Sequence, residues 1–190
     1  MPLKKNSGVP IALAPLHAAA ALVPPGAGAN NVLAGFTRIP QKGDNLCWAA
    51  CAGMLFRFRG FNPVPQQCDL AATEFGQAPG TCCVTPIPGL CDQGAFPDNT
   101  YTRAGVAFNR VLTDIPFADI QTAIDNNQPV EVYYAWTNGG AHVAMLSGYY
   151  TDSGVDEVEV DDPYYSGGRL LYSDVQAAYG FGVWNETYTF

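Results

Sequence analysis

The sequence has few basic side chains, and this shortage excludes a class of partners. Lys and Arg number 9 in 190 residues, whereas Asp and Glu number 17, and the basic residues lie scattered along the chain. Proteins that bind nucleic acid or anionic membranes gather Lys and Arg into a stripe or patch. We therefore expect neither nucleic acid nor a membrane surface as a partner.

The chain also lacks an unbroken apolar run long enough to cross a bilayer, for which about 20 residues are needed. Its most apolar stretch, VPIALAPLHAAAALV, is interrupted by two prolines and His17. Lys4 and Lys5 precede this stretch and AGA at Ala27–Ala29 follows it, so a cleaved signal peptide is an alternative to a Pro-rich leader. Residues 1–35, rich in Pro, Ala and Gly, are predicted to form an N-terminal arm, pro-segment or signal, and residues 36–190 the folded domain.

Paired metal-ligand spacing is absent from the cysteines, although the chain has 6 of them. There is no C-x2-C pair, and Cys82 and Cys83 are adjacent, so disulfides are favoured over zinc, and we expect no metal and no cofactor. This many cysteines in a Gly-rich and Pro-rich chain indicates an oxidising compartment, and secretion is the first expectation. The pairing stays open, and one member of the following set must stay free or pair outside the chain: Cys51, Cys68, Cys82, Cys83 and Cys91.

Apolar periodicity predicts helices in the earlier part of the domain and strands in the later part. Helices are expected from Asp44 or Asn45, as N-cap, to Arg59 with Gly60 behind it, and over 65–76 and 116–127. Alternating and aromatic-rich segments after residue 129, separated by TNGG and TDSG, predict antiparallel strands. A short helix capped by Ser173 and a final aromatic strand follow. Helices before strands indicate an α+β fold, and we expect a monomer.

The segment QKGDNLCWAACAGML places Cys47 in the first turn of the first predicted helix. Unpaired backbone N–H groups and the positive end of the helix dipole at such a position favour a thiolate over a thiol. Cys47 is therefore a candidate nucleophile, although a cysteine in a helix is often only a small buried hydrophobe or half of a disulfide. Cys51, one turn later, is predicted to be structural.

A cysteine nucleophile needs a base, and the sequence has only 2 histidines. His17 lies in the arm, whereas His142 comes just after a Gly-Gly turn at the start of a predicted strand, where its ring can project into a site. The next strand ends in Asp161 and Asp162, and a carboxylate there can hold the imidazole by its second nitrogen. Alternation places Asp162 on the buried side with Val160. We therefore assign the orienting role to Asp162 and keep Asp161 as the alternative.

Gln41 lies in the loop that enters the Cys47 helix. A side-chain amide in such a loop can donate a hydrogen bond to the oxyanion that forms when a thiolate attacks a carbonyl, with the Cys47 backbone N–H as second donor. A single glutamine means little by itself. Its combination with Cys-Trp at a helix start, histidine at a strand start and Asp-Pro at the next strand end is much more specific.

The segments Q-x5-CWAA, GGAHVAMLSGY and VDDPYY together resemble the papain-like cysteine proteases, most closely the bacterial AvrRpt2-like and peptidase C39-like branch. The resemblance covers residues 36–175 and implies a helical left lobe, an antiparallel β right lobe and an active-site cleft between them. It assigns the roles of nucleophile, base, orienting residue and oxyanion donor, in that order, to Cys47, His142, Asp162 and Gln41. It also implies that Tyr164 shields the acid–histidine pair. The glycine-serine lead-in of plant papains is absent here.

The function expected from this resemblance is a secreted cysteine endopeptidase, of the bacterial effector kind, that acts on a protein or peptide substrate. An acyltransferase of the transglutaminase type is an alternative, because it also uses Cys-Trp at a helix start with a later His and Asp. Gln41 favours the protease. A papain-like fold that serves as a non-catalytic binding or effector module, with Cys47 oxidised in a bridge, is a second alternative.

Overall fold

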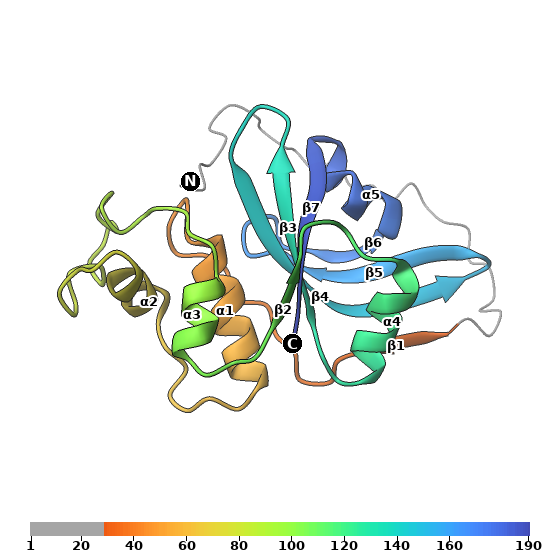
Figure 1. Cartoon of the computed structure of the whole chain (residues 1–190), viewed down its shortest axis with the longest axis horizontal. Coiled ribbons are helices and arrows are strands. Elements are labelled where there is room, and N and C mark those ends of the chain that lie inside the picture. The colour runs from red at the N-terminus through yellow and green to blue at the C-terminus, as the bar shows by residue number, and fades with distance from the viewer. Residues whose placement is uncertain (1–28) are drawn as a thin grey trace.

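The computed structural model describes residues 29–190, so the region of the expected signal, with His17, lies outside the described residues. Two lobes lie side by side (Figure 1). One lobe contains the helices α1 (Cys47–Phe58), α2 (Gln67–Glu74) and α3 (Asp98–Arg103) with the loops that join them. The other lobe contains a β-sheet together with the helices α4 (Phe117–Asp125) and α5 (Tyr172–Gln176) and the short 3-10 helix η1 (Ala178–Gly180).

The sheet is antiparallel throughout, with the strand order β2-β7-β3-β4-β5-β6, and β1 pairs with β4 outside this path. Its strands are β1 (Asn30–Val32), β2 (Asn109–Val111), β3 (Val130–Trp136), β4 (Ala141–Asp152), β5 (Val155–Asp161), β6 (Gly168–Leu171) and β7 (Gly182–Thr189). Strands β3, β4 and β5 confirm the predictions made for the segments after residue 129. The α+β class and the helix-then-strand order are likewise confirmed.

The central strands β3 and β4 are buried on both faces because both faces of the sheet are covered. Val130 and Val132 of β3 pack in one core cluster with α4, whereas Val143 and Met145 of β4 pack in a second cluster with α1. A strand buried on both sides does not alternate between apolar and polar residues. The sheet therefore forms the wall between the two cores and fixes the helical lobe against the strand lobe.

The C-terminal end of α1 follows the prediction. Gly60 adopts a left-handed conformation with φ of 79°, its N–H donates to the Arg57 carbonyl, and the Phe61 N–H donates to the Phe56 carbonyl. This pair of bonds satisfies carbonyls that the helix end leaves free. The rings of Phe56 and Phe61 stack with centroids 4.8 Å apart, which closes the helix end with an apolar contact.

The N-terminal end of α1 differs from the prediction. Leu46 is the N-cap and no side chain caps the helix, so neither Asp44 nor Asn45 has the expected role. The physical reason is that the backbone N–H groups of Asp44 and Asn45 are themselves bound by the carboxylate of Asp92, which belongs to a distant loop. These two residues form a turn before the helix instead of its cap.

Several short elements were not predicted from the sequence. Strand β1 pairs with β4 inside the stretch expected to be an arm, and Leu33 beyond it is buried in the core. Strand β2 pairs with β7, and helix α3 packs beside α2. Helix α5 has Leu171 as its N-cap, so Ser173 lies inside it and does not cap it. Elements this short depend on a distant pairing partner, which local periodicity does not reveal.

The cysteines of the helical lobe form two disulfides, Cys68–Cys83 and Cys82–Cys91. The expectation of disulfides is confirmed. Cys51 is a free, fully buried thiol whose sulfur lies 3.6 Å from the Val143 carbonyl oxygen. The structure therefore resolves the alternatives for Cys51 in favour of packing in the core between the lobes.

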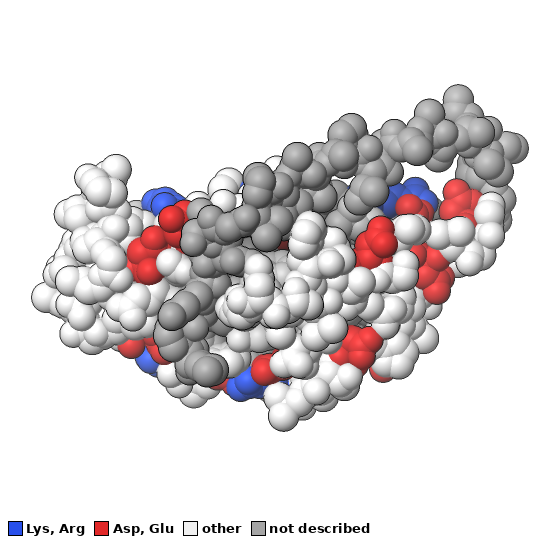
Figure 2. Space-filling view, turned by 90° about the horizontal axis from the view of Figure 1, so that it is seen from above, with Lys and Arg blue, Asp and Glu red and all other residues white. Residues whose placement is uncertain are grey.

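The surface of the described part of the chain carries mostly acidic charge. Figure 2 shows Asp and Glu side chains spread over one face of the molecule, with Lys and Arg at a few separate places. Among residues 29–190, no helix has the length and apolar character needed to cross a membrane.

Glu131 of β3 is a carboxylic acid in the core beneath the helical lobe. It is fully buried, one oxygen accepts a hydrogen bond from the Tyr101 hydroxyl, and the other oxygen has no partner within the described residues. Burial raises the pKa of Glu131 to about 8, opposed by the Tyr101 hydrogen bond and assisted by the charge of Asp98. A buried carboxyl with an unpaired oxygen is more stable protonated than ionised.

Glu131→Gln is expected to remove a loss of stability that accompanies rising pH. An unfolded glutamate titrates near 4.5, so the folded wild type binds the extra proton between about 4.5 and about 8, and its free energy of unfolding falls as pH rises through that window. The loss between about pH 5 and about pH 9 is on the order of 4 kcal/mol. Denaturant unfolding of the wild type and of Glu131→Gln, with the disulfides oxidised, at about pH 5 and about pH 9, measures it as the difference between the two proteins, because other groups such as His142 titrate in both.

Glutamine keeps the shape and the acceptor for Tyr101 but has no charge to bury. Glu159→Gln, which removes a half-buried carboxyl on β5, should retain the wild-type slope. A Glu131→Gln protein whose stability still falls with pH as the wild type does would contradict this assignment.

Candidate active site

Cys47 is the first residue of α1 and is 3% exposed. The Ala50 N–H donates to the Leu46 carbonyl and makes the first intrahelical bond, so the Cys47 N–H is one of the donors that a helix start leaves without an intrahelical partner. The thiol and a backbone donor without an intrahelical partner therefore occur on the same residue, at the positive end of the helix.

His142 and Asp162 are brought together by the pairing of β4 with β5. His142 Nε2 lies 2.9 Å from Oδ1 and 3.0 Å from Oδ2 of Asp162, and both side chains are buried. Asp161 faces the other way and accepts a hydrogen bond from the Ser147 hydroxyl. The carboxylate in contact with the ring is thus that of Asp162, as the alternation of β5 predicted.

The electrostatics of the pair favour an imidazolium beside a carboxylate. Burial lowers the pKa of His142, but the charge and hydrogen bond of Asp162, with a further contribution from Cys47, outweigh it and raise the pKa to about 10. Burial raises the pKa of Asp162, but the interaction with His142 and two backbone N–H groups outweigh it, so the net pKa is lowered. Because Nε2 faces Asp162, Nδ1 is the ring nitrogen left to accept a hydrogen bond from the Cys47 thiol.

The Asp162 carboxylate is held by donors besides the imidazole. The backbone N–H groups of Tyr164 and Tyr165 each lie 2.8 Å from Oδ1, and the hydroxyl of Tyr179 donates to Oδ2 at 3.3 Å. The Tyr134 hydroxyl in turn donates to that of Tyr179. This network fixes the carboxylate and keeps it ionised.

Aromatic rings cover the imidazole of His142. Trp136 stacks on it with centroids 6.0 Å apart, and Tyr165 meets it edge-on at 5.8 Å. Tyr164, the aromatic expected to shield the pair, is 42% exposed and packs on Tyr165 instead. The shielding ring lies one residue further along because the turn after Asp162 exposes Tyr164.

The loop that enters α1 is tied to the turn that follows Asp162. Arg38 Nε donates to the Asp162 carbonyl, and the Gln41 N–H donates to the Pro163 carbonyl at 3.0 Å. These bonds run from the segment before the Cys47 helix to the end of β5. They fix the position of the Asp162 turn relative to the Cys47 helix.

Gln41 lies beside this junction, but its amide is already engaged. Nε2 donates to the carbonyls of Gly43 at 2.7 Å and Asp44 at 3.0 Å, while Oε1 is buried without a partner in the described residues. Both N–H donors of the amide therefore brace the turn before Cys47. Gln41 can face an oxyanion only after one of these bonds is released.

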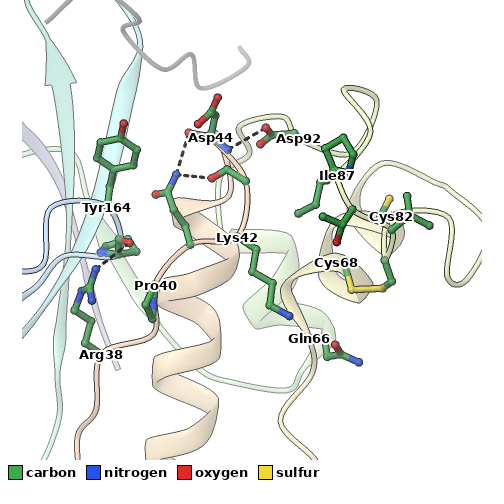
Figure 3. A pocket seen from close by; sticks show the side chains of 17 residues that line it. Arg38, Pro40, Lys42, Asp44, Gln66, Cys68, Cys82, Ile87, Asp92 and Tyr164 are labelled. Carbon is green, nitrogen blue, oxygen red and sulfur yellow. Dashed lines mark hydrogen bonds between the residues drawn. A yellow bond between two sulfur atoms is a disulfide. The ribbon is translucent and has the colours of Figure 1, made fainter. Parts of the chain in front are cut away.

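A pocket of about 800 Å³ opens between this turn and the disulfide-braced loop (Figure 3). Its apolar wall includes Ile87 and Pro40, and the Lys42 side chain extends along it towards Gln66 (Figure 3). Tyr164 closes the side that belongs to the strand lobe. The pocket has the size of a ligand site and is bounded by both lobes.

Metal-binding side chains are not assembled at this site. In the described part of the chain, one group, Cys68, Asp69 and Cys83, has the spacing of metal ligands. Its two sulfurs are bonded to each other in a disulfide, so neither can act as a thiolate ligand.

Sequence reasoning missed three side chains that support the site: Arg38, Asp92 and Tyr179. Arg38 and Asp92 lie in irregular loops, and no local pattern marks either of them. Tyr179 has a φ of 59°, which is uncommon for a residue other than glycine, but this becomes visible only in the fold.

Comparison with solved structures places the fold among papain-like proteins. A structure from work on the mite allergens Blo t 1 and Der p 1 has a TM-score of 0.53 at 14% identity, over 92% of this chain and 73% of that one. A digestive procathepsin L 3 from the larval midgut of Tenebrio molitor has a TM-score of 0.51 at 13% identity, over 88% and 70%. The two-lobed papain-like fold, with helices in one lobe and antiparallel strands in the other, is confirmed.

Sequence comparison assigns the family. No curated protein matches the sequence. The sequence model of the Peptidase C39-like family matches residues 33–189, which is most of the described chain. The chain therefore belongs to the Peptidase C39-like family, a family of papain-like cysteine proteases.

Proposed function

We propose that this protein is a cysteine endopeptidase in which Cys47 is the nucleophile, His142 the base and Asp162 the residue that orients the base. The observation that carries the proposal is the buried contact between His142 Nε2 and the carboxylate of Asp162, at 2.9 Å, with Cys47 near enough to contribute to the raised pKa of His142. A thiol, an imidazole and a carboxylate in this sequence of contacts form the arrangement that activates a sulfur nucleophile.

The reaction proceeds through a thioester. The Cys47 thiolate attacks the carbonyl carbon of the scissile peptide bond, and a C–S bond forms as the carbonyl oxygen becomes an oxyanion. The oxyanion collapses, the C–N bond breaks, and His142 gives its proton to the departing amine. His142 then takes a proton from water, which attacks the thioester and releases the carboxylic acid and Cys47.

Two donors are assigned to the oxyanion. The Cys47 N–H is at the helix start, and Gln41 supplies the second donor once one of its amide N–H groups leaves a backbone carbonyl. Donors aimed at the oxyanion lower the barrier because they interact more strongly with the developing charge than with the ground-state carbonyl. The substrate class is a protein or peptide, and the two disulfides support secretion of the enzyme.

Alkylation by iodoacetamide near neutral pH is expected to modify Cys47 about 100-fold faster than Cys51. Burial raises the pKa of the Cys51 thiol well above its ordinary value, so this cysteine remains a thiol and does not react. Peptide mapping by mass spectrometry measures both rates in the same sample. An unreactive Cys47, or one found in a bridge, would contradict catalysis and favour the non-catalytic module.

Cleavage of a peptide library with and without a primary amine separates the protease from an acyltransferase. A protease releases new amino termini whether or not the amine is present. Incorporation of the amine without peptide cleavage would contradict the proposal and support the transglutaminase-type reaction.

A further inference from the structure

The turn from Gly43 to Asn45 links the two proposed oxyanion donors, Gln41 and Cys47, and the side chain of Asp92 binds it. The carboxylate of Asp92 accepts the N–H of Asp44 at 2.9 Å and the N–H of Asn45 at 2.7 Å. A carboxylate that accepts backbone N–H groups makes charge-assisted hydrogen bonds, which are stronger than neutral ones. Figure 3 shows the Asp92 carboxylate facing this turn.

The same turn is held on its other side by Gln41, whose amide donates to the carbonyls of Gly43 and Asp44. Asp92 therefore binds the N–H groups of the turn and Gln41 binds its carbonyls. A shift of the turn would move both the Gln41 amide and the chain that leads to the Cys47 N–H. The position of the turn thus determines the positions of both proposed oxyanion donors, the Gln41 amide and the Cys47 N–H.

Gly43 permits the close approach of Asp92. A Cβ atom at residue 43 would lie 2.6 Å from Oδ1 and 2.9 Å from the carboxyl carbon of Asp92, closer than van der Waals contact allows. The glycine is needed here for space, because only a residue without a side chain lets the carboxylate reach the turn.

The loop that carries Asp92 is itself rigidly held. Cys91, its neighbour, forms the Cys82–Cys91 disulfide, and the Asp92 N–H donates to the Pro88 carbonyl. On the other side, the Gln93 carbonyl accepts the indole N–H of Trp48 at 3.0 Å. The loop is thereby fixed to the helix that carries the nucleophile.

Resting on the proposed protease function, we propose that Asp92 is a positioning residue that sets the oxyanion donors of the site by holding the Gly43–Asn45 turn. It acts through the turn and does not touch the reacting atoms. Loss of Asp92 should weaken stabilisation of the oxyanion. It should leave Cys47 and His142 in place, because the Asp92 carboxylate bonds to the backbone of the turn and to neither of these side chains.

Two chemical probes of Cys47 distinguish this role from a general structural one. Peptide cleavage and binding of a peptide aldehyde both generate a tetrahedral oxyanion or its equivalent, so both depend on the donors. Alkylation by iodoacetamide displaces iodide at a saturated carbon and forms no oxyanion. A residue that positions only the oxyanion donors should affect the first two measurements and spare the third.

For Asp92→Ala we expect kcat to fall about 100-fold with little change in KM, and aldehyde affinity to fall in parallel. The rate of Cys47 alkylation should stay within about threefold of wild type, because alkylation forms no oxyanion. Asp92→Asn retains one acceptor and should give an intermediate loss. Gly43→Ala, which blocks the approach of the carboxylate, should reproduce the Asp92→Ala pattern. Asp69→Ala, which removes an exposed carboxylate from the same lobe, should leave all three measurements unchanged.

A wild-type kcat in Asp92→Ala, or an alkylation rate that falls together with kcat in both Asp92 variants, would overturn the proposal. If Asp92→Ala fails to fold, the milder Asp92→Asn decides by the same comparison. Failure of the proposed function looks different: Cys47 in the wild type would then be unreactive or cleavage would survive Cys47→Ala.

Discussion

Cys47→Ala is expected to reduce kcat/KM for peptide cleavage by about four to six orders of magnitude, to the level of the uncatalysed background. Alanine has no atom that can form the thioester, so the covalent route is lost and no neighbouring group replaces it. Cys51 cannot substitute, because it is fully buried and held against the Val143 carbonyl. Cleavage of a fluorogenic peptide, chosen from the library, measures the loss.

Cys51→Ala is the matched control, since it removes the same atom from the same helix one turn later. It should keep the activity within a few-fold of wild type and lower the free energy of unfolding by about 1 kcal/mol, as expected when a small buried group is removed. Loss of activity in Cys51→Ala and retention in Cys47→Ala would reverse the assignment of the nucleophile.

Asp162→Ala is expected to lower kcat by about 10³ to 10⁴-fold, because His142 loses the group that fixes its orientation and stabilises its charge. The variant also leaves the N–H groups of Tyr164 and Tyr165 without their acceptor, so the turn after β5 loosens. Steady-state kinetics, combined with a circular dichroism check that the fold is retained, measures the effect.

Asp162→Asn tests the electrostatic part alone, because the amide oxygen still accepts a hydrogen bond but carries no charge. The Asp162 charge raises the pKa of His142, so its removal should lower that pKa from about 10 towards 6.5. The active pair needs a protonated imidazole, and activity is lost as pH rises through this pKa. The alkaline limb of the kcat/KM profile should therefore move to lower pH by at least about one unit.

Asp161→Asn is the matched control for this profile, since it neutralises the adjacent carboxylate, which bonds Ser147 and not the ring. Its alkaline limb should coincide with that of the wild type. A shift in Asp161→Asn with none in Asp162→Asn would transfer the orienting role to the neighbouring residue.

The candidate site is built from both lobes, so its residues are far apart in the sequence. The proposed nucleophile begins helix α1, the proposed base lies at the start of β4, and the carboxylate proposed to orient it follows directly after β5. The bonds from Arg38 and Gln41 to the turn after Asp162 connect these elements. Substitution of Arg38 would consequently remove one of the bonds that hold the two lobes together.

The sequence by itself determined the elements that carry a strong local signal. Helix α1 has apolar spacing and a terminal glycine, and strands β3 to β5 have β-branched and aromatic residues between turn signals. The burial of Asp162 and the partial exposure of Asp161 also followed from alternation along β5. Such features depend on residues that are neighbours in the chain, so periodicity and turn chemistry are enough to find them.

The tertiary structure alone decided everything that depends on contacts between distant residues. It determined which cysteines pair in disulfides and joined β1 and β2 to the sheet. In the segment before Cys47, where the sequence predicted an N-cap, it placed a turn whose N–H groups bond to Asp92. It also engaged the Gln41 amide with two carbonyls and brought Tyr179 to Asp162. These contacts are chosen by packing across the fold, and no local pattern encodes which of many polar side chains will meet a given backbone group.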